Sequence, residues 1–276
     1  MKNIILLEIK NCMQRKEFKI VFMILFFLSI GSYVIDCYEF FGQELSYVRS
    51  AYESCIIQSV QSYFVLTTEL LLLPLIATMV YSDSYYLDCK RGIYKSIITR
   101  IDKRKYIIAK AIAIFTTVFA VFFIPLAVNQ FLCFIAFPTE GFDNNQSLPP
   151  YDIGFQNYHQ ENRFDFLRIQ APFLYNLLHM AIIGLFASLF ALLAYALYFI
   201  YKKSRLSVIG GIFITYLLQE VVLSFIGEGQ NRIESLLAAG GTGSVAIMLL
   251  WIAALFISSV ALIIHKGFKD EPEIQA

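Results

Sequence analysis

The sequence contains none of the short motifs that mark common nucleotide-binding and catalytic sites. The phosphate-binding pattern GxxxxGK[ST], the dinucleotide pattern GxGxxG, the zinc-protease pattern HExxH and the nucleophile pattern GxSxG are all absent. The chain therefore has no means of binding ATP through the usual phosphate loop, and its sequence predicts a non-catalytic protein with no cofactor of its own.

Residues that bind metals are also scarce. The chain has three histidines and five cysteines, and the cysteines show no CxxC pair and no metal-ligand spacing with the histidines, His159, His179 and His265. This pattern argues against a metal site. Nucleic acid is not among the expected partners.

Apolar residues dominate the composition instead. Hydrophobic residues make up 58% of the 276 positions and the mean hydropathy is +0.64, more than one soluble core accommodates. They cluster in blocks near 20 residues long, which match a hydrocarbon layer about 30 Å thick when helical. The blocks do not alternate in polarity, which excludes an outer-membrane barrel. We predict one all-α, multi-pass membrane domain over residues 1–276.

Six apolar blocks predict six transmembrane helices. The predicted ranges are Phe18 to Val34, Ser62 to Tyr81, Ile107 to Phe137, Pro172 to Tyr201, Leu206 to Ile226 and Val245 to Ile264. The third and fourth exceed one bilayer thickness, so they should tilt, kink or extend into water, and Pro125 is the expected position of a kink in the third.

The distribution of basic residues predicts the orientation. Lys and Arg number five in residues 1–20, eight in 83–110, three in 202–205 and two in the tail, whereas the other connections hold four. Because such residues collect on the cytoplasmic side, both termini should be cytoplasmic. This pattern is that of a multi-pass protein of the plasma (inner) membrane, which we expect to be bacterial.

Residues 1–17 precede the first apolar block and have a helical pattern of their own. Ile5, Ile9 and Met13 share one helical face, with charged side chains elsewhere, which predicts an amphipathic helix on the inner membrane surface. A cleaved signal peptide is the alternative, but the leading segment is long for one.

The connection from Asp83 to Lys110 is the most unusual segment. It carries eight basic residues against three acids, and Ile93, Ile97, Ile98 and Ile101 recur in it at helical spacing after Gly92. This pattern predicts a short amphipathic helix in the cytoplasm between two spans. An ordinary basic loop resting on anionic lipid is the alternative.

The spacing of Asp88, Gly92, Arg104 and Lys110 resembles the cytoplasmic segment between the second and third spans of type 2 ABC exporter permeases. That segment reads as an acidic stretch, G-T, an apolar run, S-R and G-K; Ile93 and Ala109 depart from it. The resemblance implies a coupling helix that docks on separate ATP-binding subunits. Its implied ATPase-coupling residues are Asp88, Arg91, Gly92, Lys95, Ile97, Ile101 and Arg104.

The resemblance also implies partners and cargo. The chain is expected to pair with a second permease, identical or related, and with ATPase subunits that bind ATP and Mg. The cargo is expected to be hydrophobic or amphipathic, such as a peptide, an antibiotic or a lipid, in keeping with the 44 aromatic residues, although aromatics also pack helices.

Polar residues within the spans are candidates for the substrate path, because charge in hydrocarbon is costly and usually faces a cavity or a partner. The candidates are Glu69, Asn129, Gln130, Gln219 and Glu220. Hydrogen bonds between helices are the structural alternative for each of them.

The connections on the other side hold three further features. The acidic loop 138–171 is rich in aromatics and is predicted either to cap the exit or to pack on the span ends. Residues 233–239 are a possible re-entrant helical turn, followed by glycines that let the chain reverse. Cys37 and Cys55 fall in one connection, so they could form a disulfide or remain as two free buried thiols, and we favour the free thiols.

Three other function classes remain as alternatives. A channel or secondary transporter needs no ATPase but should show repeats or broken helices. A membrane-embedded enzyme needs clustered acids or histidines within the spans. A sensory or self-protection subunit that binds a toxin or peptide outside the cell would rely on the two larger outer loops.

Overall fold

The computed structural model describes residues 1–44, 48–139, 158, 160–201 and 204–269. These residues form helices joined by turns, and no strand occurs among them. Six helices within them are long and apolar enough to cross a membrane, so the predicted all-α, six-span architecture is confirmed. Most of the predicted cap loop, including Pro149, Pro150 and Tyr151, lies outside the described residues, as do Lys202 and Lys203.

The six long helices agree with the predicted spans to within a few residues; the first ends later, the third begins earlier and the fourth ends earlier than predicted. They are α2 (Lys16–Glu39), α3 (Tyr63–Val80), α6 (Lys103–Ala136), α8 (Pro172–Leu197), α9 (Arg205–Phe225) and α11 (Val245–Leu262). Pro172 is the first residue of α8, where its missing N–H has no intrahelical partner to lose. The assignment of α6 as a helix continues across Pro125.

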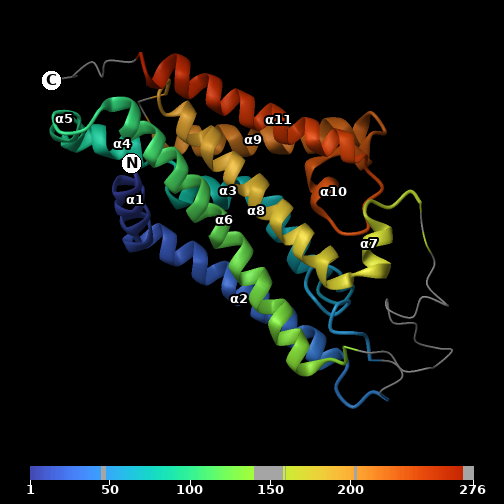
Figure 1. Cartoon of the computed structure of the whole chain (residues 1–276). Helices are drawn as coiled ribbons and strands as arrows, with labels where there is room; N and C mark the ends of the chain where they lie inside the picture. Colours follow the sequence, from blue (N-terminus) through green and yellow to red (C-terminus); the bar gives the residue numbers. More distant parts are fainter. Residues whose placement is uncertain (45–47, 140–157, 159, 202–203, 270–276) are drawn as a thin grey trace.

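Shorter helices occupy the two ends of the bundle. At one end lie α1 (Lys2–Gln14), α4 (Ser84–Lys90), α5 (Ile93–Ile98) and the π-helical turn η2 (Ile263–Gly267). At the opposite end lie α7 (Asp165–Gln170) and α10 (Ile233–Leu237), preceded by the 3-10 turn η1 (Gly229–Asn231) (Figure 1).

Helix α8 is the centre of the bundle. It packs against α3, α6 and α11, and 72% of its most apolar stretch is buried, compared with 22% for α11. Small side chains let α6 approach closely: a Cβ on Gly184 would lie 3.1 Å from the Phe119 ring, and the Ser188 hydroxyl donates to the Phe115 carbonyl at 3.0 Å. Such small residues are typical of helix contacts in membranes.

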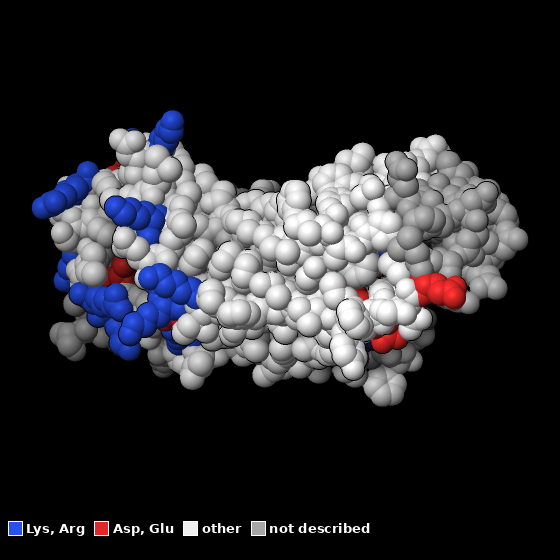
Figure 2. Space-filling model, turned by 90° about the horizontal axis from the view of Figure 1, so that it is seen from below, with Lys and Arg blue, Asp and Glu red and all other residues white. Residues whose placement is uncertain are grey.

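The two ends of the bundle differ in charge. Figure 2 shows Lys and Arg gathered at one end and exposed acids at the other, with a long uncharged surface between them. The first helix and the end of η2 both lie at the basic end, where the Lys103 ammonium donates to the Phe268 carbonyl at 3.2 Å. The charge asymmetry of the sequence is therefore a spatial asymmetry of the molecule.

Candidate functional site

A buried lysine lies at the centre of the basic end. Lys110 of α6 is 2% exposed, and its Nζ lies 2.9 Å from Glu8 Oε2 of α1 and 2.9 Å from Asp88 Oδ2 of α4. Tyr81 donates to the same Glu8 oxygen at 2.7 Å, and Tyr106 donates to the same Asp88 oxygen at 2.5 Å. One cation thus joins three helices that are distant in the sequence.

A second ionic cluster lies beside the first. Asp83, which is 1% exposed, accepts a hydrogen bond from Arg15 Nη1 at 2.6 Å and forms an ion pair with Arg205, whose Nε lies 3.0 Å away. Arg205 Nη1 also donates to Glu17 at 3.2 Å. Arg15 is the one extended residue between α1 and α2, and its guanidinium lies 4.4 Å from the centroid of the Tyr81 ring. We call these two sets of charged residues together the ionic network.

Burying charge costs free energy that its partners only partly recover, so the ionic network is not expected to add much net stability. Removing a single partner from such a pair is nevertheless expensive, about 3–5 kcal/mol, because it leaves an uncompensated charge. The consequence for the fold is geometrical: the network fixes how α1, α4, α6 and the start of α9 sit relative to one another.

An aromatic cluster lies beneath α4 and α5. Tyr94 of α5 is 2% exposed, and its ring lies 5.5 Å from Tyr85 and 5.9 Å from Tyr106. Tyr85 in turn packs on Phe199 at 4.5 Å, beyond the end of α8. Edge-on and tilted ring pairs of this kind favour a defined orientation, so the aromatic cluster seats α5 on the bundle.

The segment predicted as a short amphipathic helix after Gly92 contains α5, and a further short helix, α4, precedes it. Gly92 separates α4 from α5 with a φ of +72°, a conformation that glycine adopts without the steric cost of a Cβ. Tyr94, which is not part of the predicted isoleucine stripe, is the buried residue of α5. Ile97 and Ile101 are half-buried, whereas Ile93 and Ile98 are 45% and 37% exposed.

The outer side of α5 therefore combines apolar and basic groups. Ile93 and Ile98 are exposed there together with Arg91 and Lys95. We call these four residues the α5 face. Exposed apolar side chains with basic side chains near them are suited to a protein partner of the opposite charge.

The other predicted coupling residues lie elsewhere. Asp88 belongs to the ionic network, and Arg104 is an exposed residue in the first turn of α6, where the side chain of Asp102 accepts a hydrogen bond from its backbone N–H at 2.9 Å. The Arg104 guanidinium lies 5.6 Å from the ring of Phe268, the residue that follows η2.

The polar candidates of the third span form structural hydrogen bonds. Asn129 accepts from the Ile56 N–H at 2.9 Å and donates to the Ser29 carbonyl at 2.7 Å, and Gln130 donates to the Ala51 carbonyl at 2.9 Å. Asn176 of α8 then donates to Gln130 at 2.7 Å. These side chains hold the turns between α2 and α3 against α6 and α8, and their role in a substrate path stays a prediction.

The acids in α3 and α9 have different surroundings. Glu69 is 1% exposed, and its Oε2 has no hydrogen-bond partner among the described residues. Glu220 accepts from the Glu234 N–H at 3.0 Å, at the start of α10, and lies 3.8 Å from Arg232. Gln219 has both side-chain polar atoms buried without such a partner. Glu220 therefore helps to seat α10, and any substrate contact of these residues stays a prediction.

The expected helical turn near residue 233 is present as α10, whose Ile233, Leu236 and Leu237 are buried. Arg163, 5% exposed, donates to the carbonyls of Ser235 at 2.7 Å and Ala238 at 3.3 Å. Burial lowers the pKa of this guanidinium, yet an arginine stays protonated under any ordinary condition. Arg163 therefore caps the end of α10 with a permanent charge.

The His179 ring and the cysteines show no reactive arrangement. His179 Nδ1 lies 3.3 Å from the Leu237 carbonyl, again beside α10. Cys37 and Cys55 are free thiols, and burial raises the pKa of Cys55 to about 12 and that of Cys12 to about 11. Within the described residues no group of three His, Cys, Asp or Glu side chains could hold a metal ion.

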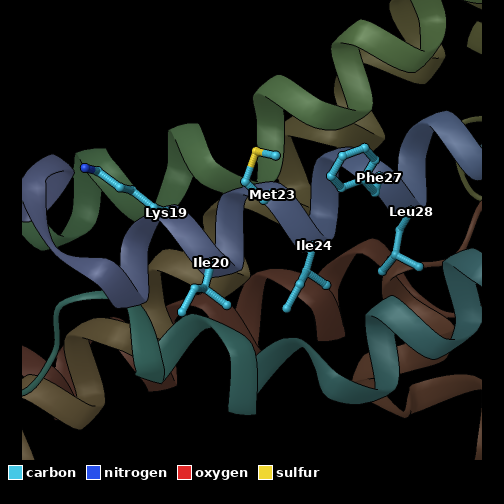
Figure 3. Close-up of a pocket in the computed structure, with 6 residues that line it drawn as sticks. All are labelled: Lys19, Ile20, Met23, Ile24, Phe27 and Leu28. Carbon is cyan, nitrogen blue, oxygen red and sulfur yellow. The ribbon is translucent and has the colours of Figure 1, made fainter.

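The outer surface of α2 is apolar and hollowed. Figure 3 shows six side chains along this one helix that line a hollow of about 580 Å³, namely Lys19, Ile20, Met23, Ile24, Phe27 and Leu28. Because no other helix contributes to the lining, this is an open side of the bundle and not an enclosed binding site.

The sequence did not indicate that Glu8 and Arg15 belong to the ionic network or that Tyr94 belongs to the aromatic cluster. Nothing in a local pattern indicates that Glu8 meets a lysine 102 positions later. The one available signal was the spacing of four residues between Glu8 and Cys12, which places both on one face of a helix. Glu8 and Cys12 are the two buried residues of α1.

Comparison of the chain with known protein families, with characterised proteins and with solved structures finds no match.

Proposed function

We propose that this chain is the membrane-spanning subunit of an ATP-driven exporter, with the α5 face as the docking surface for a separate ATP-binding subunit. The observation that carries the proposal is that one short segment is both exposed and firmly attached to the bundle. Ile98 and Lys95 are exposed, whereas Tyr94 packs on Tyr85 and Asp88 forms an ion pair with Lys110. ATP and Mg would bind in the partner, and this chain would be non-catalytic.

The ionic network gives the proposal a mechanism. If nucleotide binding draws the partner subunits together, α4 and α5 are displaced with them. Since Asp88 and Glu8 share Lys110, displacement of α4 would carry α6 and α1 along instead of flexing a loop. The spans would then redistribute between states that the nucleotide favours differently.

The remaining parts of the proposal follow from the orientation and the surface. The basic end would face the cytoplasm of a bacterial cell, by the usual bias of Lys and Arg. A second permease would complete the pathway, and the cargo would be a hydrophobic or amphipathic molecule such as a peptide, an antibiotic or a lipid.

The test is purification of a tagged chain from its native host in mild detergent. An ATP-binding protein should be recovered with it. Ile98→Asp should reduce that recovery at least about tenfold, because it replaces an exposed apolar side chain of the α5 face by a charge. Ser96→Asp, which adds the same charge to an exposed polar position of the same helix, should reduce it much less.

Recovery of no ATP-binding protein with the unmodified chain, or equal recovery with both variants, would contradict the docking role of α5.

A further inference from the structure

A second hollow lies between α6 and α11, on the side of the bundle away from α2. It has a volume of about 490 Å³, and its lining side chains are all apolar. The residues that define it are Ile108, Ile112 and Phe115 of α6, Phe256 and Val260 of α11, and Phe268 after η2. We call it the α6–α11 groove.

The α6–α11 groove runs inward from the basic end. Phe256 and Phe268 are twelve residues apart, which corresponds to about 18 Å of helix at about 1.5 Å per residue. The hydrocarbon of one leaflet is about 15 Å deep, half of a core about 30 Å thick. The groove is thus about as long as the hydrocarbon of one leaflet is deep, and it begins at the membrane surface.

The end of the groove at the surface is positively charged. Arg104 lies one helical turn before Ile108 and hence on the groove side of α6, is exposed, and has its guanidinium 5.6 Å from the Phe268 ring. Lys103 also donates to the Phe268 carbonyl at 3.2 Å, which fixes Phe268 at the mouth of the groove. Lys266 in η2 is exposed nearby in the sequence.

We propose that the α6–α11 groove binds an anionic phospholipid of the leaflet at the basic end, with an acyl chain along its apolar wall and the phosphate at Arg104. Charge complementarity selects this occupant, because the wall has no polar group to pair with a peptide backbone while the rim has a guanidinium. Basic pockets between membrane helices on the cytoplasmic side commonly recognise anionic head groups.

Quenching by brominated lipids tests the site directly. The chain has a single tryptophan, Trp251, so Trp251→Phe combined with Phe256→Trp places the sole indole in the groove wall. The brominated lipid in the vesicles is either phosphatidylglycerol or phosphatidylcholine, and quenching of the indole fluorescence measures how strongly each occupies the groove. Phosphatidylglycerol should bind about fivefold more strongly than phosphatidylcholine, the advantage expected from one basic side chain near an anionic lipid.

Arg104→Gln should abolish that preference. Lys19→Gln is the matched control, because it removes one charge at the same end but beside the separate hollow on α2 (Figure 3), so it should leave the preference intact. Equal quenching by the two lipids, or equal effects of the two substitutions, would overturn the proposal. Absence of quenching by either lipid would show that a protein neighbour covers the groove and would overturn it as well.

Native mass spectrometry of the unmodified chain keeps the proposal testable if the tryptophan variant does not fold. The unmodified chain should retain phosphatidylglycerol over phosphatidylcholine, and the Arg104→Gln chain should not. Equal retention of the two lipids by the unmodified chain would contradict the site.

Discussion

At the scale of the residue, Lys110 has the most demanding environment in the basic end. Its ammonium is almost fully buried, and the two carboxylates of Glu8 and Asp88 are each 2.9 Å away. The sequence predicted a lysine at the mouth of a span, but burial of that lysine could not be predicted. It depends on Glu8, which is brought to it only by the packing of α1 on α6.

Removal of Lys110 should be strongly destabilising. Lys110→Ala leaves the buried Glu8 and the half-buried Asp88 beside each other without a cation, and we expect the free energy of unfolding to fall by about 3–5 kcal/mol. Thermal unfolding of the purified chain in detergent measures this loss of stability. Lys105→Ala, an exposed lysine in the same helix, should change it by less than about 0.5 kcal/mol.

A combined variant separates charge compensation from packing. Adding Glu8→Gln and Asp88→Asn to Lys110→Met should recover part of the lost stability, because no buried charge is then left unpaired. If Lys110→Ala were as stable as Lys105→Ala, the ionic network would not be the link between α1, α4 and α6.

At the scale of the element, the long helices were predictable, and so were helical segments near α1, α5 and α10, but the packing of the short helices was not. Six apolar stretches of about bilayer length determine six spans whatever their neighbours are, because the membrane imposes the length. The isoleucine spacing predicted a helix after Gly92 but not which side of it is buried, because the ring of Tyr94 packs on Tyr85 and Tyr106. Such contacts come from distant segments and leave no local pattern.

The break between α4 and α5 should depend on Gly92. Gly92→Ala places a Cβ at a φ of +72°, which costs about 1–2 kcal/mol for an ordinary L-residue. We expect faster proteolysis of residues 88–100 and a lower unfolding temperature. Gly31→Ala is the control: Gly31 lies within α2 at an ordinary φ, with nothing within 4 Å of the added Cβ, so no loss of stability should follow. Equal behaviour of the two variants would contradict a turn that requires glycine.

At the scale of the whole molecule, charge and apolar surface divide the protein into three zones. The basic end carries the ionic network and the α5 face, the middle presents uncharged helices to its surroundings, and the opposite end holds α10 (Figures 1 and 2). Arg163 donates there to the Ser235 carbonyl of α10. The sequence predicted this division through its basic residues. The placement of Arg163 on α10 could not be predicted, because these residues lie more than 70 positions apart.

The central claim is that the α5 face contacts an ATP-binding subunit, and site-specific photo-crosslinking in the native host tests it most directly. A photoreactive amino acid at position 98 should capture an ATP-binding protein upon illumination. The same group at position 166, an exposed aromatic position of α7 at the opposite end, should not. Capture of the ATP-binding protein at position 98 alone is the predicted result, whereas capture at neither position, or equally at both, would contradict the account.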